Sequence, residues 1–405
     1  MRITGGNVFS GGAFAAADLV IDGDRIAGVV SRGAADGEAG AAEGAVPAGS
    51  AQSDGGADLD GAAASSDGDV VDATGCYVVP GFIDIHFHGC VGADLCDAAD
   101  EAVRAIARHE ALRGVTAVCP ATMTYPEERL ASVVDAAAAF EPAADEAALV
   151  GINMEGPFIS PDKIGAQNPA YVQRADAAML RRLQKRADGL VKLVDIAPEE
   201  PGALDFVAEV ADEVRVSIAH TCTDYDTARE AFARGARHMT HLYNAMPGLH
   251  HRKPGPIAAA WECPEATVEL ICDGVHVHPA MARLTFGLFG AERICLISDS
   301  MRACGLEDGT YDLGGQDVTV RGNVATLADG TIAGSVTDLA ACVKVAVREM
   351  GVPLEDAVRA ATLTPACAIG IDGERGSLEA GKIADVVVLD QELNVKHVIV
   401  RGGLL

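Results

Sequence analysis

Most of the chain between residues 79 and 305 repeats one pattern, in which a short apolar run precedes an amphipathic stretch. The amphipathic segment EAVRAIARHEALRG keeps its apolar residues at helical spacing and ends in Gly114, which suits a helix end. Buried strands are predicted at residues 79–88, 115–120, 149–155, 191–197, 214–220, 238–242, 268–276 and 294–299. Eight such strand–helix units predict an α/β protein with a (β/α)8 TIM-like barrel.

Both ends of the chain instead show short alternating strands separated by glycine-rich turns. Residues 1–78 and 373–405 each hold too few strands to be stable alone, so we expect them to pair into one small β-sandwich domain. The catalytic barrel is predicted over 79–305. A β segment at 306–333 is expected to pack near the small domain and the active site, and helices at 334–372 to complete the barrel.

Residues 32–69 depart from both patterns. They are rich in Ala, Gly, Ser and Asp, with eight acidic residues and one arginine. Such a segment buries too little apolar surface to offset the entropy lost on ordering. We therefore expect a disordered acidic insertion in the N-terminal part of the small domain.

Composition narrows the functional classes. The 405 residues are 49% hydrophobic, as in a globular protein, and the net charge of −28 disfavours binding to nucleic acid or to an anionic membrane. The eleven cysteines form no Cys-x-x-Cys pair, which favours free thiols in a reducing compartment. Because neither a signal peptide nor a membrane-spanning apolar run is visible, we expect a cytoplasmic protein.

Two histidines end the first predicted strand of the barrel. In the segment PGFIDIHFHG, His86 and His88 stand two positions apart, which places both side chains on one face of a strand. Neutral imidazole is a common ligand for zinc and similar metals, so the pair is a candidate half of a metal site. An alternating strand with two histidines on a solvated face would give the same pattern, and the pair alone leaves both interpretations open.

Four more polar residues end other predicted strands: Glu155 the third, His220 the fifth, His241 the sixth and Asp299 the eighth. In a (β/α)8 barrel these ends meet at one mouth. A helix cap or a core histidine explains each residue singly but not their joint placement. A divalent ion held by imidazoles and a carboxylate lowers the pKa of bound water to roughly 7 on zinc. Asp299 is then the candidate for a free carboxylate that carries the proton.

Several longer motifs extend this picture: PGFIDIHFHG, MEGPFISPDKIGAQNPAYV, THLYNAMPGLHHRKPG, DGVHVHP, SDSMRACGL and TIAGS. With them the chain resembles the N-acetylglucosamine-6-phosphate deacetylases of the amidohydrolase superfamily, over nearly its whole length outside the acidic insertion. The resemblance implies metal-dependent hydrolysis of the acetamide of N-acetyl-D-glucosamine 6-phosphate. The products are D-glucosamine 6-phosphate and acetate, in amino-sugar catabolism or recycling.

The resemblance also implies a ligand set. Glu155, His220 and His241 match the ligands of the metal that all members keep, while His86 and His88 match the pair found in members that hold a second ion. The expected cofactor is one or two divalent ions, zinc or iron, with Glu155 available as the bridge. Relatives are commonly dimers, so a homodimer is expected.

Roles around the substrate follow from the same resemblance. Asp299 matches the catalytic general acid and base, and His276 matches a histidine that contacts the substrate and helps polarise the acetyl carbonyl. The other positions that match substrate contacts are Ala166, Asn244, Ala245, Arg252, Ile332, Ala333 and Gly334. Among them Asn244, Ala245 and Arg252 match the sugar-phosphate site, where arginine offers a bidentate fork to phosphate oxygens.

Three alternatives stay open. Gln167 stands where some relatives carry a histidine that reaches the sugar, and glutamine cannot be charged, so N-acetylgalactosamine 6-phosphate is a competing substrate. Another type of amidohydrolase would need a bridging lysine near the end of the fourth strand, but Lys192 lies at its start. A catalytically silent sugar-phosphate-binding protein would not need metal ligands together with a free carboxylate.

Overall fold

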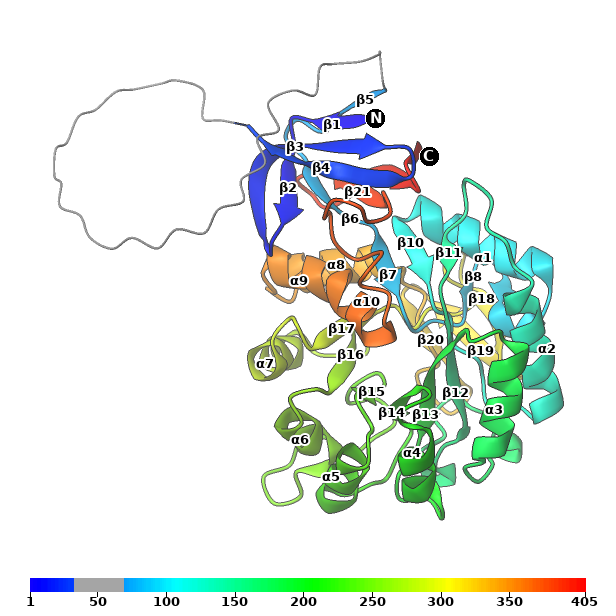
Figure 1. Cartoon of the computed structure of the whole chain (residues 1–405). Helices are drawn as coiled ribbons and strands as arrows, with labels where there is room; N and C mark the ends of the chain where they lie inside the picture. Colours follow the sequence, from blue (N-terminus) through cyan, green and yellow to red (C-terminus); the bar gives the residue numbers. More distant parts are fainter. Residues whose placement is uncertain (33–68) are drawn as a thin grey trace, which may run out of the picture.

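The structure is a computed structural model that describes residues 1–32 and 69–405. The acidic insertion predicted at 32–69 falls, except for its two end residues, outside the described residues. Figure 1 shows the first and last strands of the chain gathered together, beside a larger body in which helices surround parallel strands. The two ends of the sequence therefore build a common structural element.

This element is a nine-stranded sheet. Its order is β23-β22-β21-β6-β2-β3-β1-β5, with β4 paired to β3, and β6 joins the two halves by pairing with β2 on one side and β21 on the other. Residues such as Ile3, Leu19 and Ile399 form its apolar core. Its strands are β1 (Arg2–Thr4), β2 (Asn7–Ser10), β3 (Ala13–Asp22), β4 (Arg25–Ser31), β5 (Val70–Asp72), β6 (Tyr77–Pro80), β21 (Val386–Leu389), β22 (Val395–Val400) and β23 (Gly403–Leu404).

Two parallel sheets carry the predicted site. One holds β7 (Phe82–Asp84), β10 (Val115–Val118) and β11 (Ala148–Leu149), and the other runs in chain order through β12 (Ile152–Phe158), β13 (Val191–Ile196), β14 (Arg215–Ile218), β15 (His238–Met239), β16 (Thr267–Ile271) and β17 (Ile294–Ile297). Backbone hydrogen bonds link the two sheets on both sides. Asn153 donates to Pro120 at 2.9 Å, and Asp299 donates to His86 at 3.0 Å. The strands consequently form a curled sheet.

Strand lengths differ from the sequence prediction. The predicted strand at 79–88 is two elements, because β6 belongs to the nine-stranded sheet and β7 ends at Asp84. His86 and His88 therefore follow a strand, in irregular backbone, and strand alternation does not explain how their side chains converge. The eighth strand likewise ends at Ile297, before Asp299.

The helices pack their apolar faces on these strands. Helix α1 buries Val103, Ile106, Ala107 and Ala111 as its spacing predicts, and Gly114 follows its C-cap with a φ of +85°. The helices are α1 (Asp100–Leu112), α2 (Glu127–Ala138), α3 (Ala177–Arg186), α4 (Ala203–Val210), α5 (Tyr225–Ala233), α6 (Gly255–Glu262), α7 (Pro279–Phe289), α8 (Leu339–Arg348), α9 (Leu354–Ala360) and α10 (Leu363–Ile369). None of the helices in the described ranges is both long and apolar enough to cross a membrane.

Two small sheets lie outside these layers. A hairpin joins β8 (Gly89–Cys90) to β9 (Ala93–Asp94) just after the histidine pair. The segment predicted at 306–333 forms an antiparallel sheet of β18 (Gly309–Leu313), β19 (Gln316–Arg321) and β20 (Val324–Thr326), which pairs with no described strand of the nine-stranded sheet. The Gln316 amide donates to the Ala166 carbonyl, which ties this segment to the loop after β12.

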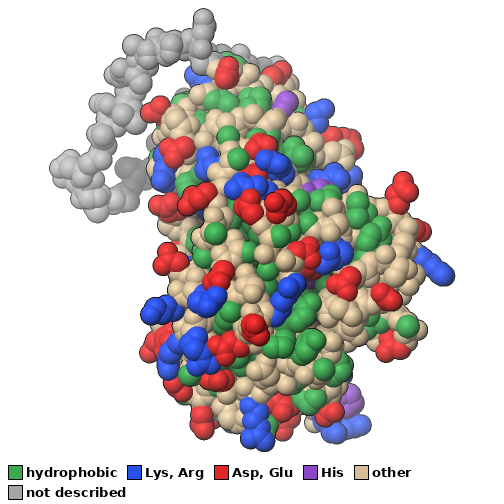
Figure 2. Space-filling model, turned by 90° about the vertical axis from the view of Figure 1, so that its right-hand side faces the viewer, with side chains coloured by type: hydrophobic (Ala, Val, Ile, Leu, Met, Phe, Trp, Pro, Cys, Tyr) green, Lys and Arg blue, Asp and Glu red, His purple; other side chains and the backbone are tan. Residues whose placement is uncertain are grey.

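Charges of both signs are interspersed on the face of the molecule drawn in Figure 2. Lys and Arg side chains on that face stand next to Asp and Glu side chains. The described part of this face has no continuous basic surface.

Gly114, which directly precedes β10, lies against the nine-stranded sheet. A Cβ at this position would lie 3.0 Å from Cγ2 of Val387, a fully buried β21 residue. We predict that Gly114→Ala lowers the free energy of unfolding by about 2–4 kcal/mol, through the cost of a positive φ and through overpacking. Gly189→Ala is the matched control, since Gly189 has a φ of +83° with no atom within 4 Å of the added Cβ, and about 1–2 kcal/mol is expected there. Equal losses in urea unfolding would contradict the packing argument.

Candidate metal centre and active site

Three predicted site residues adopt left-handed backbone conformations. His220, His241 and Asp299 have φ values of 41°, 26° and 50°, and each follows the end of its strand by two residues. Such a conformation costs a non-glycine residue about 1–2 kcal/mol, and it is kept where the surrounding structure imposes it. Here it turns the chain at the ends of three strands of one sheet, β14, β15 and β17, and the three side chains meet beside Glu155 of β12.

The first candidate metal centre consists of Glu155, His220 and His241. Glu155 Oε1 lies 2.9 Å from His220 Nε2 and 3.2 Å from His241 Nε2, and the two ring nitrogens are 3.1 Å apart. Donor atoms about 2.0–2.2 Å from a shared tetrahedral ion stand roughly 3.3–3.5 Å apart. The triangle is thus close to the size that a divalent ion requires, and its donors are of the type that zinc and iron accept.

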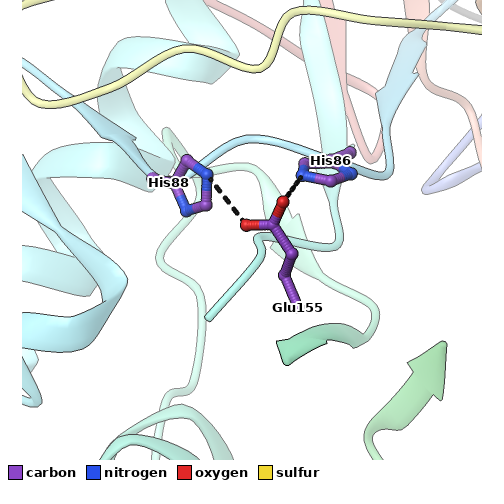
Figure 3. Close-up of side chains that lie close together, drawn as sticks. All are labelled: His86, His88 and Glu155. Atoms are coloured by element: carbon purple, nitrogen blue, oxygen red, sulfur yellow. Dashed lines mark ion pairs between the residues drawn. The ribbon is translucent and has the colours of Figure 1, made fainter. Parts of the chain in front are cut away.

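The second candidate centre shares Glu155. Its other members are His86 and His88, with Nε2 atoms 3.6 Å from Oε1 and 3.4 Å from Oε2 of Glu155 (Figure 3). Asp299 Oδ1 lies 3.9 Å and 3.4 Å from the same two nitrogens. His86 Nε2 is buried without a hydrogen-bond partner, although burial of an unpaired polar atom is costly. A cation between these groups would satisfy that atom, so the residues fit a second ion.

The carboxylates of the site are held in the charged form. Burial alone would raise the pKa of Glu155, but hydrogen bonds from His220 and His241, together with the nearby His86 imidazole, bring the pKa well below its usual range. Burial opposes ionisation of Asp299 too, and the hydrogen bond from His88 with the charge of His86 lowers the pKa of this residue. Asp299 is therefore a carboxylate at neutral pH, as a proton acceptor must be.

Glu269 of β16 supports both candidate centres and was not among the residues predicted from the sequence. Its Oε2 accepts hydrogen bonds from His86 Nδ1 at 2.8 Å and from the His241 backbone at 2.9 Å, while Oε1 faces His238 Nε2 at 3.0 Å. The bond to Nδ1 leaves Nε2 of His86 free to face Glu155. The signal in the sequence was a glutamate within the apolar run TVELI.

Asp273 plays a similar part for His276. Its Oδ2 lies 2.7 Å from His276 Nδ1, and its Oδ1 accepts the His276 backbone N–H at 2.9 Å. Burial lowers the pKa of His276, but this hydrogen bond and the Asp273 charge outweigh burial and raise it overall. The ring is thereby fixed with Nδ1–H towards Asp273, and in the imidazolium form that the raised pKa favours, Nε2–H is left to donate to a ligand.

These residues surround a cavity of about 490 Å³, a volume suited to a small molecule. The predicted residues that line it are His88, Glu155, Ala166, His220, His241, Asn244, Ala245, His276, Asp299, Ile332 and Gly334. Three others do not line it. His86 lies fully buried beside the cavity, Ala333 is also buried, and Arg252 is exposed on the loop before α6.

Two further lining residues bear on ligand binding. Gln167 Nε2 donates to Glu155 Oε2 at 2.6 Å, and its Oε1 accepts from the Thr124 backbone at 2.7 Å. The glutamine predicted to replace a sugar-contacting histidine therefore contacts the shared ligand carboxylate directly. Lys163 also lines the cavity, and its carbonyl faces His220 Nδ1 at 2.8 Å. Lys163 was not predicted, although it precedes Gln167 in the same motif.

Comparison with known proteins places this site in a family. The Amidohydrolase family model matches residues 77–405. The chain belongs to the amidohydrolase family. It is 37% identical to the N-acetylglucosamine-6-phosphate deacetylase of Bacillus subtilis, over 81% of this chain and 84% of that protein. It is also 37% identical to an N-acetylgalactosamine-6-phosphate deacetylase of Escherichia coli O157:H7, over 80% of this chain and 86% of that protein.

A solved structure resembles the whole chain. N-acetyl-D-glucosamine-6-phosphate deacetylase from Mycobacterium smegmatis, solved as a mutant in complex with N-acetyl-D-glucosamine-6-phosphate, superimposes with a TM-score of 0.86 at 33% identity. The match covers 100% of this chain and 98% of that chain. The chain thus has the amidohydrolase fold.

The histidine pair is predicted to determine how many ions are bound. We expect His86→Asn with His88→Asn to lower the metal content by one ion per chain, because Glu155, His220 and His241 still form a complete centre. Mass spectrometry of metal-loaded, desalted protein measures this. His250→Asn with His251→Asn is the matched control, since these exposed neighbouring rings are 4.4 Å apart and do not line the cavity. Unchanged stoichiometry in the His86/His88 variant would remove the second centre.

Proposed function

We propose that this chain is a metal-dependent hydrolase that converts N-acetyl-D-glucosamine 6-phosphate to D-glucosamine 6-phosphate and acetate. The proposal rests mainly on one observation: the Glu155 carboxylate faces four imidazoles. Glu155 and Asp299 both line the same cavity. The similarity to deacetylases over four-fifths of the chain supports the reaction type. One or two divalent ions, zinc or iron, are the proposed cofactor.

Each polar side chain then has a defined task. When bound, a divalent ion supplies a Lewis acid and lowers the pKa of a water molecule. Asp299 accepts the proton of the attacking water and donates it to the departing amino nitrogen. His276, oriented by Asp273, donates Nε2–H to the acetyl oxygen, where negative charge develops.

The sugar phosphate is proposed to bind at the outer part of the cavity. Asn244 and the Ala245 backbone, which has a φ of 50°, are the proposed phosphate contacts together with Arg252. Lys163 is an additional cation, and unlike Arg252 it lines the cavity. The proposed sugar contacts are Ala166, Ile332, Ala333 and Gly334.

Two observations favour N-acetylgalactosamine 6-phosphate as a second candidate substrate. The relative that acts on N-acetylgalactosamine 6-phosphate is as similar as the one that acts on the gluco epimer. Gln167 also donates to Glu155, so its amide is not free to serve the sugar as a charged histidine would. N-acetylgalactosamine 6-phosphate is therefore the alternative substrate.

The organisation of the protein completes the proposal. Residues 79–305 and the helices of 334–372 constitute a closed (β/α)8 barrel, and residues 1–78 and 373–405 constitute the small β domain. The segment at 306–333 covers the active site, which is supported by its cavity-lining residues Leu313, Thr331 and Ile332. We propose a homodimer in the cytoplasm.

Asp299 gives the sharpest test of the mechanism. Asp299→Asn should keep the metal content near wild type and reduce kcat for acetate release from N-acetylglucosamine 6-phosphate by ~10²–10⁴-fold, since the amide cannot accept the proton. Asp329→Asn, a change in another acidic residue of the cavity lining, should leave kcat within a few-fold of wild type. Near-normal turnover by Asp299→Asn would remove this residue from the mechanism.

Phosphate recognition can be tested separately. We expect Arg252→Ala to raise KM for the phosphorylated sugar by about 10–100-fold while kcat changes little, because a charge-assisted contact is worth roughly 1.5–3 kcal/mol. The ratio of kcat/KM between phosphorylated and free N-acetylglucosamine measures the effect. Lys163→Ala, assayed in parallel, shows whether the lining cation shares this role. An unchanged ratio in the Arg252 variant contradicts its assignment.

A further inference from the structure

A third group of side chains that could hold a metal ion lies away from the cavity. Cys90 of β8, with His109 and Glu110 of α1, places one thiol, one imidazole and one carboxylate with ligand atoms within 4.8 Å of one another. None of the three lines the cavity of about 490 Å³. The group is therefore separate from the proposed catalytic centre, although β8 follows His88 directly.

The Glu110 side chain has no partner in the described structure that accounts for its burial. The residue is 1% exposed, and neither carboxylate oxygen has a hydrogen-bond partner among the described residues. The nearby Arg113 is engaged at 3.5 Å with Asp338. A buried carboxylate without a counter-charge must become protonated or bind a cation. His109 Nε2 is likewise buried and unpartnered, so two of the three donors lack a protein partner.

The loop after β17 covers this group. Val91 donates its backbone N–H to the Cys304 carbonyl at 2.8 Å, which places Cys304 beside the segment that carries Cys90. Gly305, with a φ of +81°, approaches so closely that a Cβ would lie 3.0 Å from the His109 ring. Cys304 is 2% exposed, and the Glu110 charge contributes to raising the pKa of its thiol after the larger effect of burial. The loop after β17 thus packs against both the segment that carries Cys90 and the His109 ring.

We infer that Cys90, His109 and Glu110 form a structural site for a borderline divalent cation such as zinc. A thiolate with an imidazole and a carboxylate is a donor set that zinc accepts and that magnesium and calcium disfavour. Tetrahedral zinc donors stand about 3.3–3.8 Å apart, so the side chains close by about 1 Å around the ion. Binding releases the Cys90 thiol proton to solvent, and the ion ties the β8 hairpin to α1.

Cobalt distinguishes this site from the catalytic centre. The proposed catalytic ligands are nitrogen and oxygen atoms only, so a thiolate-to-cobalt charge-transfer band in the near ultraviolet reports the new site alone. The experiment uses full-length protein carrying Cys222→Ser and Cys367→Ser, which remove the exposed thiols. The protein is stripped with a chelator and titrated with Co²⁺ while metal content is measured.

We expect an intense band that saturates at one thiolate-ligated cobalt per chain. Cys90→Ser should abolish it, and Cys263→Ser, a half-buried cysteine outside the group, should retain it. Glu110→Gln, which preserves shape, should weaken cobalt binding by about 100-fold or more, since losing even an outer partner costs ~10–100-fold. If Cys90→Ser fails to fold, the Glu110→Gln titration decides.

Two results would overturn the inference. One is a protein that binds cobalt without the charge-transfer band, which would indicate that Glu110 is a neutral acid beside the Cys90 thiol. The other is a band, or a cobalt affinity, that Glu110→Gln leaves unchanged. Neither result bears on acetate release, so the site and the proposed reaction stand or fall separately.

Discussion

The candidate site depends on the placement of one buried carboxylate among four imidazoles. Glu155 Oε1 lies between His220, His241 and His86, while Oε2 faces His88 and accepts a hydrogen bond from Gln167. Bringing so many titratable groups out of water is costly unless their charges and lone pairs are matched. Divalent cations would provide this match, because the nitrogen and oxygen lone pairs that face one another could coordinate the ions. The same arrangement explains why the pKa of Glu155 stays low despite complete burial.

The surrounding structure holds this arrangement in two ways. First, the residues with left-handed backbone after β14, β15 and β17 change the direction of the chain. In a continued strand, successive side chains would instead point to opposite faces. Beneath them, Glu269 fixes the His86 ring and the His241 backbone, and Asp273 fixes the His276 ring. Outer carboxylates of this kind set the tautomer and orientation of metal-binding histidines. The geometry therefore belongs to the folded framework and not to the ligands alone.

The sequence predicted the ligand types and the order of the strands, because apolar runs and their polar ends are local features. It could not predict that β6 and β7 separate between Val79 and His88, since the choice of sheet depends on partners from residues 386–389. From the sequence, Gln167 was recognised only as the residue that stands where some relatives carry a sugar-contacting histidine. Its hydrogen bond to Glu155 depends on how the loop after β12 folds back over the strand ends. Glu269 and Lys163 were missed for a similar reason, because their partners are distant strands or loops. Asp273 was missed although its partner, His276, is only three residues away.

The central claim is that ions held around Glu155 enable hydrolysis of an acetylated hexosamine phosphate. It is tested most directly by acetate release from N-acetylglucosamine 6-phosphate, with chelator-stripped protein titrated with Zn²⁺ or Fe²⁺ and with N-acetylgalactosamine 6-phosphate assayed in parallel. The account predicts that stripped protein releases no acetate and that release returns in proportion to the ions bound, with Glu155→Gln remaining inactive at the same metal concentration. Undiminished release by fully stripped protein, or full activity of Glu155→Gln, would contradict it.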